Sequence, residues 1–244
     1  MIQMFIALLG GALAGYIGAI SASGGLISIS ILIFLGLPTN AAIATNRFSG
    51  LGLYAGALPK FQKAKKIAWN KVWRLIPLAI AGGLIGSNLL VAIDKELLSK
   101  VIAILLLCML PVVLFNKKIG TAKLKTSKAK EQVGYLVYFF MMIYGGFFGG
   151  GVGIFLIYTL IYFFGMTYTE AIATYFFPWF ILTLTVLVVF VSHDLVVYRL
   201  GIPMAFGMYL GGLIGAKHAL KNGDEWVRII LAIMIIASSI KLLS

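Results

Sequence analysis

The chain has 244 residues, of which 61% are hydrophobic and 11% charged, and its mean hydropathy is +1.05. This balance excludes a soluble domain and predicts an all-α protein that crosses a lipid bilayer several times. The net charge of +13 does not indicate nucleic-acid binding, because the basic residues gather in loops without interleaved aromatic side chains or a nucleic-acid motif.

The chain begins with a hydrophobic segment that a cluster of small residues interrupts. Apolar residues fill positions 4–20 and 26–35, on either side of the sequence Ser-Ala-Ser-Gly-Gly at 21–25. Clustered glycine favours a helix break, and in lipid a break is tolerated only inside protein or beside a water-filled cavity. The shorter half, about 11 residues or ~16 Å of helix, cannot span a membrane alone. The segment is therefore either one tilted crossing or a re-entrant hairpin.

Three further spans follow, at residues 41–58, 73–91 and 97–115, and basic regions flank them. Residues 59–74 carry six basic side chains and no acid, and residues 116–131 carry six lysines against Glu131 alone. Loops rich in Lys and Arg mark the cytoplasmic side. We therefore expect a multi-pass protein of the plasma membrane with both of these loops in the cytoplasm.

The same pattern recurs later in the chain at a constant offset of 129 residues. A second broken segment fills residues 133–148 and 154–164, and spans are expected at 171–191, 200–220 and 226–243. The landmarks that recur are Gly36 with Gly165, Ala-Ile-Ala-Thr at 42–45 and 171–174, and Gly-Gly-Leu-Ile-Gly at 82–86 and 211–215. Asn40 and Thr169, at equivalent positions before a span, are candidate helix N-caps.

This recurrence divides the chain into a first transmembrane repeat (1–116), a cytoplasmic basic linker (117–131) and a second transmembrane repeat (132–244). If each broken segment crosses the membrane once, there are about eight crossings and the repeats are parallel. If the broken segments are helical hairpins, there are ten crossings and the repeats are inverted. The first count is our primary expectation.

The order, spacing and duplication of these motifs resemble the sulfite exporter TauE/SafE family of membrane permeases. The resemblance rests on the glycine-rich break, the Gly-Leu-Pro turn at 36–38 with Ala-Ile-Ala-Thr after it, and the Gly-Gly-Leu-Ile-Gly span. It implies a permease of small sulfur-containing or organic anions such as sulfite, sulfoacetate or other sulfonates. The sequence departs from this pattern at Ser21 and Ser23, where the second break has glycines, and at Thr167, which stands where the first turn has Pro38.

An anion inside a membrane needs hydrogen-bond donors and a positive potential. Arg47 is the sharpest candidate because guanidinium binds oxyanions bidentately, although it could instead extend to the lipid interface. The glycines could equally pack helices, and the threonines could bond their own helix. The predicted substrate-binding residues are Ser21, Ser23, Gly24, Gly25, Thr45, Asn46, Arg47, Gly149, Gly150, Gly151, Gly153, Thr174, Tyr175 and Pro178. Gly82, Gly86, Gly211 and Gly215 are assigned to helix packing.

The sequence carries no phosphate-binding loop, metal-ligand cluster or nucleophile beside a base, so we expect no enzyme, metal or cofactor. Transport would be passive or coupled to a proton or ion gradient. The expected partners are a small anionic substrate, the lipid bilayer and the coupling proton or ion; a homo-oligomer stays open. The alternatives are a non-transporting membrane scaffold or subunit, and a permease of a different small solute.

Overall fold

The computed structural model describes residues 1–92 and 125–243, and within these ranges the chain forms eight helices and no strand. Four segments are long and apolar enough to cross a membrane: α1, α4, α8 and the Tyr198–Asp224 part of α9. The span expected at 97–115 lies outside the described residues. The helices are α1 (Ile2–Ser21), α2 (Gly24–Phe34), α3 (Thr39–Lys63), α4 (Trp69–Ala92), α6 (Lys128–Phe147), α7 (Val152–Phe164), α8 (Tyr168–Ser192) and α9 (Tyr198–Leu243).

Most element boundaries lie within two residues of those expected, but α3 continues to Lys63 instead of ending at 58, α4 begins at Trp69 instead of 73, and α6 begins at Lys128 instead of 133. The N-caps of α3 and α8 are Pro38 and Thr167, two residues before the expected Asn40 and Thr169. Thr167 forms a capping box with Glu170, which satisfies two N–H groups of the first turn. The backbone of α9 leaves the helical region at Gly223, between the two spans predicted there.

The first broken segment is a helical hairpin. Helix α1 ends at Ala22, whose φ of 54° reverses the chain, and α2 then runs back along α1. A Cβ atom at Gly24 would overlap the carbonyl oxygen of Ala14, while Gly10, nearer the start of α1, faces Ile31 in the later part of α2. These pairings require antiparallel helices.

The second broken segment folds in the same way. Gly149 and Gly151 take positive φ values of 76° and 77° between α6 and α7. Gly134 at the start of α6 faces Phe164 at the end of α7, and the rings of Tyr135 and Phe164 lie 4.9 Å apart. The expectation of a single tilted crossing is therefore wrong for both segments, because each one turns back on itself.

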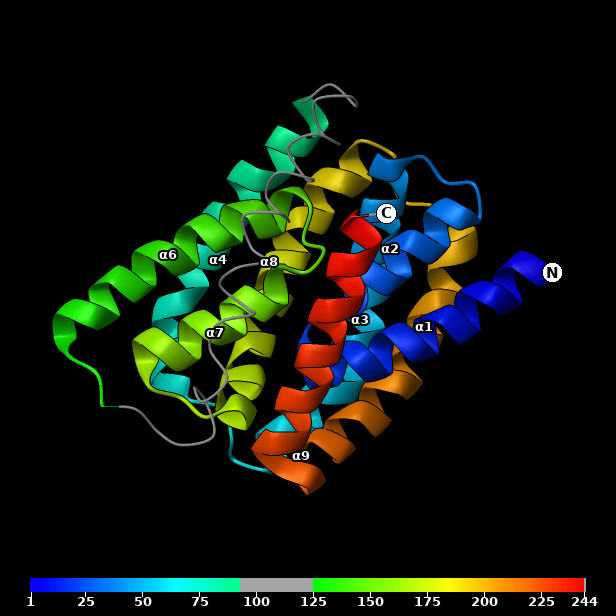
Figure 1. Cartoon of the computed structure of the whole chain (residues 1–244). Coiled ribbons are helices and arrows are strands. Elements are labelled where there is room, and N and C mark those ends of the chain that lie inside the picture. Colours follow the sequence, from blue (N-terminus) through cyan, green and yellow to red (C-terminus); the bar gives the residue numbers. More distant parts are fainter. Residues whose placement is uncertain (93–124, 244) are drawn as a thin grey trace.

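The long helices fall into two groups, α1, α3 and α9 in one and α4, α6 and α8 in the other, and the two groups run in opposite directions. In α3 and α8, which occupy corresponding places in the sequence, Tyr54 contacts Thr183 and Phe61 contacts Phe176, so these helices are antiparallel. Helices α1 and α3 run parallel to α9, and α4 runs parallel to both α6 and α8. Figure 1 shows α1, α2, α3 and α9 together on the right, and α4, α6, α7 and α8 on the left. Each group thus includes one long helix from the other half of the chain.

Glycines make the close contacts inside each group. Gly211 and Gly215 of α9 face the backbone of α1, at Ala12 and Tyr16. Gly82 and Gly86 of α4 face the backbone of α6 in the same manner. Small residues let membrane helices approach until their backbones touch. The assignment of these glycines to helix packing is confirmed.

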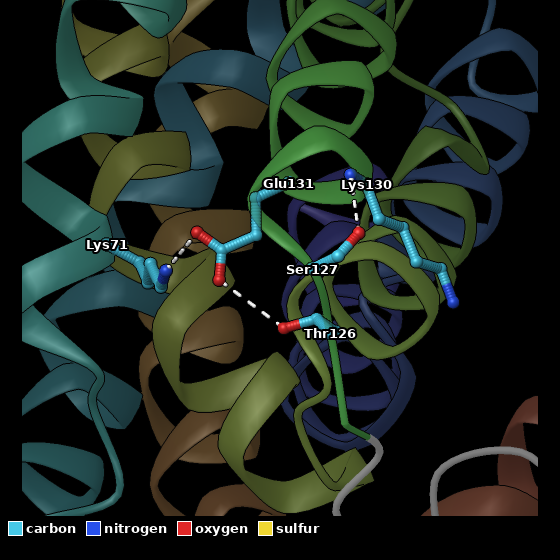
Figure 2. A network of polar contacts seen from close by, with 5 residues as sticks. All are labelled: Lys71, Thr126, Ser127, Lys130 and Glu131. Atoms are coloured by element: carbon cyan, nitrogen blue, oxygen red, sulfur yellow. Dashed lines mark hydrogen bonds and ion pairs between the residues drawn. The ribbon is translucent and has the colours of Figure 1, made fainter.

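The described parts of the two basic regions lie at one end of the bundle. Lys71, at the start of α4, forms an ion pair of 2.6 Å with Glu131, in the first turn of α6 (Figure 2). The same carboxylate accepts a hydrogen bond of 3.4 Å from Thr126. Lys130 lies over the ring of Tyr162, 3.8 Å from its centre, so the end of α7 is at this end too. We call this face the basic end.

Candidate functional site

A cavity of about 40 Å³ lies where the two helix breaks meet, with α3 and α8 on either side. This volume exceeds the roughly 10–15 Å³ that a single water molecule requires, so the cavity has room for a few water molecules or one small solute. The predicted site residues that line it are Gly24, Gly25, Asn46, Arg47, Gly149 and Tyr175. The cavity wall therefore contains residues of both breaks and of both long helices between them.

Arg47 supplies the positive charge of the cavity. Its side chain is only 4% exposed, and one guanidinium nitrogen, Nη2, donates a hydrogen bond to the carbonyl oxygen of Gly145. The guanidinium carbon lies 5.0 Å from the centre of the Trp179 ring, which is a favourable cation–π distance. The alternative that Arg47 extends to the lipid interface is excluded by this burial.

The charge of Arg47 has no acidic partner among the described residues. No carboxylate is among the side chains that line the cavity, and Arg47 forms no ion pair within the described ranges. Its Nε atom, which is buried, has no hydrogen-bond partner. A buried charge without a partner of opposite sign costs several kcal/mol. An anion bound beside the guanidinium of Arg47 would offset this cost.

Two further groups of donors lie beside Arg47. The side-chain oxygen of Asn46 accepts a hydrogen bond from Ser28, which leaves the amide N–H groups of Asn46 next to Gly25. Helix α2 begins at Gly24, and the first N–H groups of a helix have no partner within it. The positive end of the α2 dipole therefore meets the cavity together with the guanidinium.

Aromatic side chains form much of the remaining wall: Tyr175 and Trp179 were candidates for lining the pathway, whereas Tyr54 and Phe176 were not. Tyr54 and Thr183 both line the cavity and are hydrogen-bonded to each other, with 3.3 Å between their hydroxyl oxygens. Trp179 lies under Arg47, and its ring is 5.3 Å from that of Tyr175. Tyr54 could have been noticed because it follows Arg47 by two helical turns and so shares its face of α3. The other missed lining residues are Ala14, Gly18, Ala22, Gly50, Leu53, Phe176 and Met208.

The predicted threonines lie outside the cavity wall. The hydroxyl oxygen of Thr45 accepts a hydrogen bond of 3.0 Å from the backbone N–H of Val197, just before α9. Thr174, at the corresponding position of α8, accepts one of 3.0 Å from the N–H of Ala68, just before α4. Each hydroxyl thus joins a helix of one half of the chain to the start of the long helix that the other half contributes to the same group.

The other predicted residues also lie behind the wall rather than in it. Ser21 and Ser23 are fully buried and bond to each other at 2.6 Å, and Ser21 also donates to the carbonyl oxygen of Ile17. Gly153 packs against the backbone of Ala22, which brings the two breaks into direct contact. Gly150, Gly151 and Pro178 are buried near them but are not among the lining residues. Within residues 1–92 and 125–243, no group of three or more His, Cys, Asp or Glu side chains is placed to hold a metal ion.

The amino-acid sequence of this chain is similar to those of known proteins. The model of the family described as sulfite exporter TauE/SafE matches residues 7–242. A probable membrane transporter protein of Haemophilus influenzae is 28% identical, over 92% of this chain and 88% of its own length. The probable membrane transporter protein ORF9 of Sinorhizobium sp is 24% identical, over 95% and 89% of the two chains. The probable membrane transporter protein YfcA of Escherichia coli K12 is 25% identical, over 95% and 86%. No solved structure matches the chain.

Proposed function

Because this chain belongs to the sulfite exporter TauE/SafE family of membrane transporters, we propose that it is a secondary permease of small anions that bind beside Arg47. The anions we have in view are sulfite, sulfoacetate and other small sulfonates or organic anions. The observation that carries this proposal is the buried guanidinium of Arg47, which lines a cavity without an acidic partner among the described residues.

The donors around the cavity fit an oxyanion. Hydrogen bonds between a guanidinium and an oxyanion are charge-assisted and stronger than neutral ones. The start of α2 adds backbone N–H groups at the positive end of a helix dipole, and Asn46 adds an amide donor. A cation would find no carboxylate in the described part of the wall, so this arrangement favours negative charge.

The arrangement of the helices supports two inverted repeats. Thr45 and Thr174 are 129 residues apart, as are their partners Ala68 and Val197, so the two hydrogen bonds are reciprocal. Such reciprocity is expected of two similar units related by a two-fold axis. Transporters built from inverted repeats bind substrate at the repeat interface, between broken helices, and alternate its access to the two sides. The hairpins favour the higher of the two crossing counts predicted from sequence, and we place the basic end in the cytoplasm of the plasma membrane.

Flux measurements on Arg47 variants test this proposal. The purified protein in liposomes should take up sulfite, or another anion from a panel of sulfoacetate, taurine, thiosulfate and simple carboxylates that stabilises it against heat. Arg47→Gln should reduce this uptake by about 10- to 150-fold, because hydrogen bonds to a charged group contribute about 1.5–3 kcal/mol. Arg74→Gln, which removes an exposed guanidinium at the basic end, is the matched control and should leave uptake unchanged. Undiminished uptake by the Arg47 variant would refute the assigned role.

A further inference from the structure

The two helix breaks differ in what they present to the cavity. The second break presents the carboxyl end of α6, where the last carbonyl groups lack partners within the helix and the dipole is negative. The oxygen of Tyr144 accepts from the N–H groups of Phe148 and Gly149, and the oxygen of Gly145 accepts from Arg47. This end of the helix is occupied by a cation.

The second break is also shaped around that cation. A Cβ atom at Gly149 would overlap Nη2 of Arg47 and lie 2.6 Å from its guanidinium carbon. A Cβ atom at Gly145 would lie 2.6 Å from the Trp179 ring, and this ring faces the guanidinium at 5.0 Å. Gly145, Gly149 and Trp179 together form what we call the arginine cradle. All three come from the second half of the chain, whereas Arg47 comes from the first.

The first break presents a helix start to the cavity, beside Gly18 and Ala22 at the end of α1. Helix α2 starts there, and Gly24 and Gly25 at its start line the cavity. A Cβ atom at Gly25 would have its nearest neighbour, Nδ2 of Asn46, at 3.6 Å, so the cavity is open beside Gly25. The start of α7 does not face open space, because Gly153 is packed against the backbone of Ala22.

We propose that the breaks have different tasks: the first binds the anion, while the second holds Arg47 where it can meet that anion. This inference rests on the proposed function, because it assigns parts to the same site. It also accounts for a single arginine serving two similar breaks, since the residue 129 positions after Arg47 is Phe176. Gly149 is then a positioning residue, which acts on the anion through Arg47.

A double-mutant cycle between positions 47 and 149 tests this division. Gly149→Ala should raise the KM for sulfite uptake by about tenfold or more, because the added methyl group displaces a guanidinium that binds the anion. Arg47→Lys should also raise KM. In the Arg47→Lys protein, Gly149→Ala should cause no further rise, because lysine lacks the planar group that the methyl would overlap.

Gly151→Ala is the matched control for backbone strain, since its φ of 77° equals that of Gly149 within a degree. The effect of Gly151→Ala on KM and on the melting temperature should be the same whether position 47 holds arginine or lysine. If Gly149→Ala multiplies KM equally in both backgrounds, or leaves it unchanged, the inference is overturned. If the wild-type protein moves none of the anions in the panel, the proposed function fails instead. In that case the melting temperatures of the same variants test the arginine cradle without transport. Equal effects of Gly149→Ala on the melting temperature with Arg47 and with lysine would overturn the inference.

Discussion

At the scale of single residues, two buried hydroxyls couple the halves of the molecule. Thr45 and Thr174 each accept the backbone N–H of a residue just before a long helix of the other half. Replacing either threonine by valine keeps the shape and leaves that N–H without a partner. We expect each variant to lose about 1–3 kcal/mol of unfolding free energy, and the two losses to be similar. Thermal unfolding in detergent measures this, with Thr→Ser at each site as the control that keeps the hydroxyl. A loss confined to one of the two sites would contradict the reciprocal arrangement.

The residues of the site differ in how far the sequence reveals them. Arg47 and Asn46 could be predicted because a charged or amide side chain inside an apolar run needs a partner. Thr183 could not, because its contact with Tyr54 depends on how two distant helices cross. Thr45 and Thr174 were predicted as ligands of the substrate from their equivalent positions. The two threonines are indeed equivalent in the structure, because their hydrogen bonds are reciprocal. These bonds are made to backbone N–H groups of the other half of the chain, and neither threonine lines the cavity.

Among the helices, the close packing of the first hairpin requires Gly24, and the open space of the cavity requires Gly25. A Cβ atom at Gly24 would overlap a backbone oxygen of α1, which cannot move away without opening the hairpin. Gly24→Ala should therefore destabilise the protein by about 1–3 kcal/mol or more. Gly25→Ala adds the same methyl group to open space beside Asn46, so it should keep the melting temperature and reduce anion uptake. Melting temperatures and uptake rates of both variants check this pair. Equal destabilisation by the two substitutions would contradict the packing described for α1 and α2.

The existence of the breaks could be predicted from composition, but their direction could not. Six glycines between residues 144 and 153 are enough to interrupt a helix, and most helix ends lie within five residues of those expected from the hydrophobic pattern. Whether the chain then continues or turns back depends on φ at a few positions and on the surface offered by the preceding helix. Ala22 is the example: alanine rarely takes a left-handed φ, and no sequence signal marks it as the reversal point.

At the scale of the whole molecule, the exchange of long helices explains how one cavity forms between two separate stretches of sequence. Helix α9 packs along α1 and α3, and α4 packs along α6 and α8, so each hairpin is braced by a helix from the other half. The offset of 129 residues predicted corresponding elements, but only packing could place α4 and α9 in opposite groups. The opposed directions of the two groups bring the turns of the two hairpins face to face.

The central claim is that an anion binds between the start of α2 and the guanidinium of Arg47. The most direct measurement is a structure of the protein with selenite, the heavier analogue of sulfite, in which the anomalous signal of selenium locates the ion. We expect a selenium peak beside Arg47 and the N–H groups of Gly24 and Gly25, with its oxygens within hydrogen-bonding distance of them, and the loss of this peak in Arg47→Gln. A selenium peak elsewhere in the protein, with this cavity empty, would contradict it.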